Sequence, residues 1–197
     1  MHIRPVAPSE YQAAGRLVVA AYEALPGAHM SEGYAALLAD VARRAAEADV
    51  LVAAAAGQET EVAGQETTAA GQGTEVAGQA AGLLGCVTFV PSPASPWAEQ
   101  LQPDEAGVRM LAVRPAAQGR GVGAALLAAC VERAHQLGKS ALFLHSTPWM
   151  LSAHHIYEKA GFARVPERDW FPVPEVPLLA FFLELPSSTA GGASSPS

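Results

Sequence analysis

The sequence predicts a mixed α/β fold in which helices cover the faces of one β-sheet. Strand-like apolar runs alternate along the chain with helix-like patterns, in the order β-α-α-β-β-β-α-β-α-β-β. The 197 residues fit a single domain. Apolar residues make up 50% of them, so a chain of this size can bury a core without disulfides or metal ions.

The N-terminal part of the chain predicts one strand and two helices. The strand is expected over residues 2–6, where apolar and polar residues alternate. Ser9 can cap a helix over residues 10–24, because serine is a preferred N-cap residue. A second helix is expected over residues 32–48, since apolar residues recur from Tyr34 onward with helical spacing.

Two segments stand apart in composition. Residues 57–82 repeat a Gly-Gln-Glu-Thr-like unit every seven residues. A glycine in each unit costs a helix about 1 kcal/mol, and no paired apolar seam accompanies the period, so we expect a flexible insertion rather than a coiled coil. It joins the apolar runs 50–55 and 83–90 like the tip of a long hairpin. A tail rich in Ser, Gly, Ala and Pro, residues 186–197, is expected to be disordered, which leaves residues 1–185 as the domain.

The C-terminal part alternates between strands and helices. The expected strands are residues 108–113, 141–145, 162–165 and 178–185. The expected helices are residues 122–137, which Gly138 ends, and residues 151–160.

Charge and composition exclude several classes of protein. The net charge of −7 disfavours sequence-independent binding of nucleic acid, although four of the acidic residues belong to the repeat. The first eight residues do not resemble a secretory signal, and no run approaches the roughly 18 apolar residues of a membrane span. Cys86 and Cys130 are too few for a disulfide framework or a zinc site. We therefore expect a soluble, cytoplasmic protein that binds neither nucleic acid nor membrane.

Residues 113–127 hold the most informative pattern, in which a buried strand ends, a glycine-rich turn follows and a helix begins. The first N–H groups of a helix have no partners within the helix, and the helix dipole adds positive charge there. Residues 107–139 also carry five basic residues against Glu132 alone. The pattern therefore predicts a site for an anion, and for a pyrophosphate in particular.

Several kinds of loop compete for this pattern. Two alanines follow Gly123, where the P-loop of nucleotide triphosphatases requires Lys and Ser or Thr. A dinucleotide-binding loop could use Gly119 and Gly121, but it needs an acidic residue about 20 positions later, where His145 stands. A loop that binds acyl-coenzyme A and a tight turn without a ligand remain as alternatives.

Downstream motifs favour the acyl-coenzyme A loop. Residues 118–123 follow the pattern Gln-x-x-Gly-x-Gly, and residues 153–162 follow Ala-x-x-x-Tyr-x-x-x-Gly-Phe. Residues 109–115 read Arg-Met-Leu-Ala-Val-x-Pro. In this order and spacing the motifs resemble those of the GNAT superfamily of N-acetyltransferases. The resemblance covers residues 106–168, about a third of the chain.

The resemblance implies acetyl-CoA as cosubstrate, no metal ion, and direct attack by a primary amine in a ternary complex. It assigns Tyr157 as the general acid that protonates the departing CoA thiolate. It assigns the strand backbone at Leu111, Ala112 and Val113 to the pantetheine arm and the thioester carbonyl. It assigns the pyrophosphate to the backbone N–H groups of the loop, namely Gln118, Gly119, Arg120, Gly121, Val122, Gly123 and Ala124.

The sequence departs from the family pattern at two positions. A glutamate that often serves as general base on the strand before the loop is replaced by Gly107. An asparagine that commonly precedes the tyrosine by seven residues is replaced by Met150. His145, at the end of its expected strand, is the first candidate for the base, and Glu105, two residues before Gly107, is the second.

The missing glutamate leaves a second hypothesis, a catalytically silent module that binds or senses acyl-CoA. For the enzyme, the acceptor is a small-molecule or peptide amine, and His29, Glu32 and Trp170 are candidates to line its side of the site. A homodimer is possible by analogy with the family. A dinucleotide-dependent enzyme is the third hypothesis.

Overall fold

A computed structural model describes residues 1–26, 30–56 and 82–186. The predictions for the seven-residue repeat and for the tail therefore fall outside the described residues, apart from the last glycine of the repeat and the first proline of the tail. The apolar runs that flank the repeat pair as the antiparallel strands β2 (Asp49–Ala54) and β3 (Leu83–Val90), as the hairpin prediction requires.

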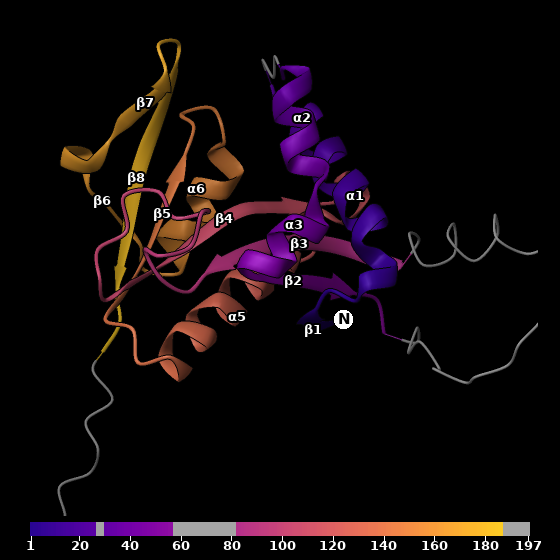
Figure 1. Cartoon of the computed structure of the whole chain (residues 1–197), viewed down its shortest axis with the longest axis horizontal. Helices are drawn as coiled ribbons and strands as arrows, with labels where there is room; N and C mark the ends of the chain where they lie inside the picture. Colours follow the sequence, from indigo (N-terminus) through magenta and orange to yellow (C-terminus); the bar gives the residue numbers. More distant parts are fainter. Residues whose placement is uncertain (27–29, 57–81, 187–197) are drawn as a thin grey trace, which may run out of the picture.

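The described strands form one mixed sheet, in which β4 and β5 run parallel and the other pairs run antiparallel. A further strand, β7 (Trp170–Val173), pairs with β8 in a hairpin that projects from the molecule (Figure 1). The order across the sheet is β1 (His2–Pro5), β2, β3, β4 (Glu105–Val113), β5 (Ala141–Ser146), β8 (Val176–Glu184) and β6 (Ala163–Arg164).

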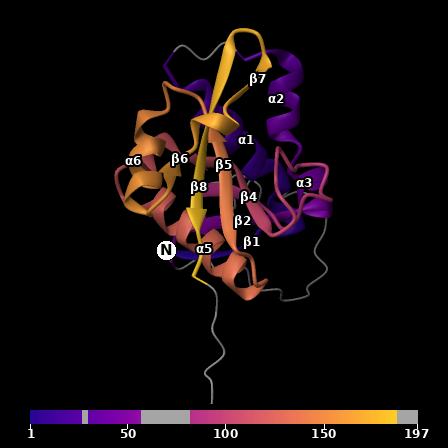
Figure 2. The ribbon, with the colours of Figure 1, turned by 90° about the vertical axis from the view of Figure 1, so that its left-hand side faces the viewer.

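Helices cover both faces of this sheet (Figures 1 and 2). One face carries α1 (Tyr11–Glu23), α2 (Glu32–Ala39) and α3 (Val41–Glu47), with their own apolar core. The opposite face carries α5 (Val122–Gln136) and α6 (Leu151–Lys159), with a second core. Single 3-10 turns precede α1, α5 and β7, at Pro8–Glu10, Pro115–Ala117 and Pro166–Arg168. The expected fold, a mixed sheet between helices, is confirmed.

The helix predicted over residues 32–48 is wrong in one respect, because the chain forms two helices there. Asp40 leaves the helical conformation, with ψ at 71°, and its side chain caps α3 by accepting a hydrogen bond from the Arg43 N–H at 3.0 Å. The buried Arg44 guanidinium donates to the carbonyls of Leu37 and Leu38 at the end of α2. Both helices pack on the same core, so the apolar periodicity continues across a break that it cannot reveal.

Three strand predictions also need correction. β4 begins at Glu105 rather than at residue 108, because its first four residues pair with β5 although Glu and Gly are poor strand formers. The strand expected over residues 162–165 is reduced to the two residues of β6. β7 was not predicted as a strand at all, since Pro172 interrupts its pattern, yet it pairs with an early start of β8 at Val176.

The strands β4 and β5 separate part-way along their length. Their pairing runs from Glu105 to Val108 on β4 and ends there, although β4 continues to Val113 and β5 to Ser146. Near the separation Met110 has a positive φ of 53°, and one extra residue of β4 is accommodated in its register with β3. We call the point where β4 and β5 separate the fork.

Candidate active site

The predicted anion-binding loop lies at the N-terminus of α5, directly after β4. Gly119 and Gly121 have φ values of 72° and 79°, which side chains disfavour, and a Cβ added at either would meet no described atom within 4 Å. Gly123 marks a close approach of the two helices, because a Cβ there would lie 2.9 Å from Cδ1 of Ile156 on α6, which would have to move. The glycines thus open the loop toward solvent and let the two helices approach each other.

An edge of β4 that no described strand pairs with connects this loop to the fork. From Arg109 to Val113, β4 keeps β3 on one side while β5 has moved away on the other. The backbone of Leu111, Ala112 and Val113, predicted to hold a pantetheine arm, lies along this edge. A side-chain bond from Gln118 Nε2 to the Val113 carbonyl, at 3.4 Å, ties the loop to the end of the strand. An extended ligand that lies on the edge would reach from the loop to the fork.

Tyr157 lies on the α5–α6 face of the sheet. It is 4% exposed and packs against Phe162 and Phe181, with ring centroids 6.0 and 5.4 Å away. Burial raises the pKa of the Tyr157 phenol above its usual value. A phenol of this kind stays protonated at neutral pH, as a general acid must.

His145 lies on the opposite face of the sheet, immediately past the fork. Its side chain is 4% exposed, and Nε2 lies 3.2 Å from the carbonyl oxygen of Arg168. A carbonyl oxygen can only accept, so Nε2 carries the hydrogen and, in the neutral ring, Nδ1 carries the lone pair. Burial lowers the pKa of His145, against the opposing effects of the Arg168 carbonyl and of Glu99. The ring is therefore suited to accept a proton at Nδ1.

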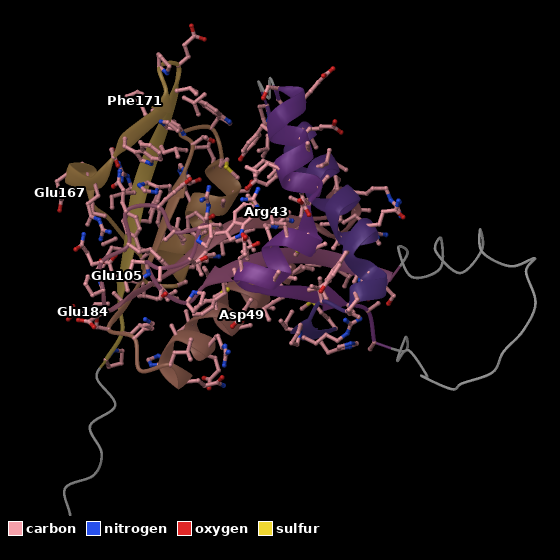
Figure 3. The ribbon with its side chains drawn as sticks, in the orientation of Figure 1. Arg43, Asp49, Glu105, Glu167, Phe171 and Glu184 are labelled. Atoms are coloured by element: carbon pink, nitrogen blue, oxygen red, sulfur yellow. The ribbon has the colours of Figure 1, made fainter. Side chains whose placement is uncertain are left out.

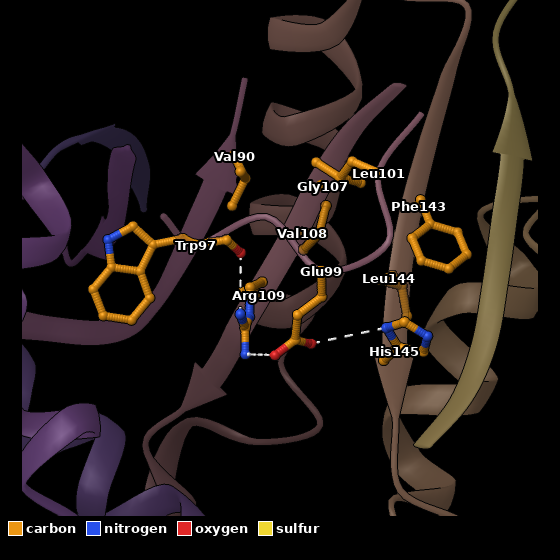
Figure 4. A pocket seen from close by; sticks show the side chains of 10 residues that line it. All are labelled: Val90, Trp97, Glu99, Leu101, Gly107, Val108, Arg109, Phe143, Leu144 and His145. Atoms are coloured by element: carbon orange, nitrogen blue, oxygen red, sulfur yellow. Dashed lines mark hydrogen bonds and ion pairs between the residues drawn. The ribbon is translucent and has the colours of Figure 1, made fainter. Parts of the chain in front are cut away.

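The space in front of His145 is a small pocket (Figure 4). Two charged residues in it were not predicted as site residues, Glu99 and Arg109, whose Oε1 and Nη2 atoms lie 2.5 Å apart. Glu99 comes from a proline-rich connection, so no local pattern identified it. The pocket is lined by Val90, Trp97, Glu99, Leu101, Gly107, Val108, Arg109, Phe143, Leu144 and His145.

Comparison with known families assigns the chain. The model of the acetyltransferase (GNAT) family matches residues 58–162, more than half of the sequence. The protein belongs to the GNAT acetyltransferase family. This family uses acetyl-CoA, so the expected cosubstrate is confirmed at the level of the family. No match was found among curated proteins.

Solved structures support the same fold. An acetyltransferase of the GNAT family from Staphylococcus aureus Mu50 is 11% identical with a TM-score of 0.64, over 93% of this chain and 98% of that one. The protein yncA from Salmonella typhimurium, solved with its cofactor acetyl-CoA, is 19% identical with a TM-score of 0.59, over 98% of both chains. The ribosomal-protein-S18-alanine N-acetyltransferase of Escherichia coli is 16% identical with a TM-score of 0.58, over 99% of both chains.

Glu105, the second candidate for the base, is committed to other partners. Arg168 binds both of its oxygens, at 2.7 and 2.8 Å, and the Gln102 N–H donates to Oε2 at 2.9 Å. In the view of Figure 3, Glu105 lies in the lower part of the molecule, and Phe171 on the projecting hairpin lies at the top. The geometry therefore favours His145 over Glu105 as a base. Gly107 has no side chain to act as a base. The backbone is also closely packed there, since a Cβ would lie only 3.3 Å from the Leu101 and Val90 side chains.

The remaining candidates are spread around the site. Trp170 lies on β7 with its ring centroid 6.2 Å from that of His145, so the structure brings these two together. Glu32 is exposed at the start of α2, and His29 lies outside the described residues.

Thiol and metal chemistry find little support in the described part of the chain. Cys86 and Cys130 are buried, and burial raises the pKa of the Cys86 thiol to about 12. The described residues contain no cluster of three or more potential metal ligands.

No helix among the described residues is long and apolar enough to span a bilayer.

Proposed function

We propose that this protein is an N-acetyltransferase that moves the acetyl group of acetyl-CoA to a primary amine by direct attack in a ternary complex. The observation that carries the proposal is the fork. It offers an open strand edge that begins at the glycine-rich loop and ends next to His145, while Tyr157 lies on the opposite face of the sheet.

The residues fit acetyl-CoA as the ligand. The backbone N–H groups of residues 118–124 would hold the pyrophosphate, supported by the positive end of α5. The glycines of the loop leave room for close approach, since Gly119 and Gly121 face open space. The free edge at residues 111–113 would bind the amide groups of the pantetheine arm as a neighbouring strand does. An N–H of this edge would also polarise the thioester carbonyl.

His145 and Tyr157 divide the proton transfers. His145 Nδ1 takes a proton from the acceptor ammonium, so that the nitrogen lone pair can form a bond to the acetyl carbon. The carbon–sulfur bond then breaks, and Tyr157 gives its proton to the sulfur. The nitrogen loses two protons in all: one passes through His145 to solvent, and the other balances the proton that Tyr157 donates.

A silent acyl-CoA-binding module is the alternative function. It is favoured by Gly107, which supplies no carboxylate on the strand, and by the engagement of Glu105 with Arg168. Such a module would bind CoA at the same loop and release none from acetyl-CoA.

A panel of amines distinguishes the two functions. Purified protein is mixed with acetyl-CoA and with small amines, amino acids or peptides, and free CoA thiol is measured. Release that depends on both protein and amine is expected for the enzyme. Calorimetric binding of CoA, with no release for any amine, would establish the silent module instead.

We further infer that residues 1–185 act as one domain around this site and that the protein works in the cytoplasm. The described strands form one sheet with helices on both faces, and both cysteines are free thiols, as a reducing compartment allows.

A further inference from the structure

Glu99 places one carboxylate oxygen in the pocket in a defined position. Its Oε1 is held by the guanidinium of Arg109 at 2.5 Å, and Arg109 also donates to the Trp97 carbonyl at 3.0 Å. The proline-rich connection is thereby fastened to β4 at two points. The second oxygen, Oε2, is directed toward His145 and lies 3.8 Å from its Nδ1 (Figure 4).

The gap between Glu99 and His145 lies between two hydrogen-bond acceptors. The Arg168 carbonyl fixes the hydrogen of the neutral ring on Nε2, so Nδ1 presents a lone pair to the carboxylate oxygen. A separation of 3.8 Å is too long for a direct hydrogen bond. One nitrogen that carries at least two hydrogens can donate to both atoms at once, and a positive charge on it strengthens both bonds. A primary ammonium group has this chemistry.

We propose that the acceptor's ammonium group binds beside Glu99 Oε2 and His145 Nδ1, where its nitrogen can lie within hydrogen-bond distance of both atoms. The inference rests on the proposed acetyltransferase function and specifies its acceptor as a primary alkylammonium. Glu99 binds the cation, and His145 removes its proton.

The surroundings of the gap agree with this ligand. The carbon side chains of Val90, Leu101 and Phe143 line the same small pocket, so they offer the ammonium group no competing hydrogen-bond partner. Arg109 prevents the carboxylate from rotating, since it occupies one of its two oxygens. The positive charge of Arg109 also offsets much of the negative charge of Glu99. A bound ammonium group is therefore held mainly by directed hydrogen bonds and can release its proton to His145.

The test compares two small nucleophiles that differ in charge at pH 7, ethylamine as the cation and hydroxylamine as the neutral molecule. Acetyl transfer from acetyl-CoA is measured for the wild type and for Glu99→Gln, with the uncatalysed rate subtracted. We expect Glu99→Gln to lower kcat/KM for ethylamine about 10- to 100-fold, the effect of losing a hydrogen bond between charged groups. The value for hydroxylamine should change by less than about threefold, because a neutral nucleophile does not need the carboxylate.

Two control variants separate ammonium binding from a general loss of structure. Glu132→Gln removes one negative charge from the exposed side of α5 and should leave both nucleophiles unaffected. Arg109→Gln breaks the same ion pair but keeps the carboxylate, which it leaves free to rotate, so it should lower kcat/KM for ethylamine less than Glu99→Gln does. Equal losses in Glu99→Gln and Arg109→Gln, or equal losses for both nucleophiles, would overturn the proposal.

A binding measurement keeps the inference separate from the proposed function. In the presence of CoA, ethylammonium chloride should shift the NMR signals of the His145 ring in the wild type and not in Glu99→Gln, and ethanol should shift them in neither. If no nucleophile releases CoA but this shift occurs, the proposed enzyme fails and the subsite stands. If ethylammonium leaves the His145 signals of the wild type unchanged, the subsite is disproved.

Discussion

The two sides of the proposed site are built in different ways. The cosubstrate side consists of main-chain groups from one continuous stretch, residues 111–124, shaped by glycines and by the end of β4. The acceptor side consists of side chains from β4, β5 and the proline-rich connection, namely Arg109, His145 and Glu99. Main-chain sites tolerate side-chain changes that keep the backbone conformation, whereas the acceptor side depends on single atoms. Substitutions on one side should therefore change different kinetic constants from substitutions on the other.

The largest effect is expected at Tyr157, which belongs to neither side and is proposed to protonate the departing thiolate. Tyr157→Phe keeps the buried ring and removes only the hydroxyl, so kcat should fall about 100-fold or more, as for the loss of a general acid. The KM for acetyl-CoA should change little, and circular dichroism should confirm the fold. A variant with the kcat of the wild type would remove Tyr157 from the mechanism.

The next largest effect should fall on the cosubstrate side alone. Gly121→Val places a β-branched residue at a φ of 79°, a conformation that such residues strongly disfavour. We expect the Kd for CoA, measured by calorimetry, to rise about 10-fold, in line with a strain of 1–3 kcal/mol. Gln118→Ala, which leaves the loop backbone able to keep its conformation, should raise it less than about threefold. If the alanine variant loses as much affinity as the valine variant, the site does not rest on the backbone.

A smaller effect is expected in the pH dependence, which reports the acceptor side. The charged and polar groups that face the His145 ring are Glu99, Arg109, and the guanidinium and carbonyl of Arg168. Because burial lowers the pKa of His145, the ring loses its proton at a lower pH than an exposed histidine, whose pKa is about 6.5. Hence kcat/KM should rise with pH and reach half its maximum below about pH 6.5. If the His145→Gln variant shows the same rise of kcat/KM with pH, the titrating group is not His145.

The smallest effect should come from a position outside both sides. Asp40→Ala removes the cap of α3 and should lower the free energy of unfolding by about 1 kcal/mol. For a domain of this size, the melting temperature should drop by about 2–4 °C. Neither kcat nor the Kd for CoA should change by more than about twofold. A large kinetic effect would show that α2 and α3 position the acceptor side.

The same division explains what the sequence could reveal. The loop, the strand before it and Tyr157 form patterns within a few residues, so they were predicted with their positions. Glu99 and Arg109 become neighbours only through the path of the proline-rich connection, which no periodicity describes. Asp40 was hidden for another reason, since the apolar pattern follows the core and not the helix ends. The availability of His145 and the engagement of Glu105 depend on Arg168, a distant residue that contacts both.

Beyond the fork, the single sheet becomes two. Among the described strands, β1–β4 and the group of β5, β8 and β6 are joined by four residue pairs, from Glu105 to Val108. Local opening should start at this seam, where few backbone bonds hold the halves together. A pantetheine arm along β4 would close the seam from within, and binding would raise stability in proportion to the logarithm of the CoA concentration. Between residues 109 and 113, slow hydrogen exchange of the amides that point away from β3 would then require the cosubstrate, which would complete the sheet of the protein that uses it.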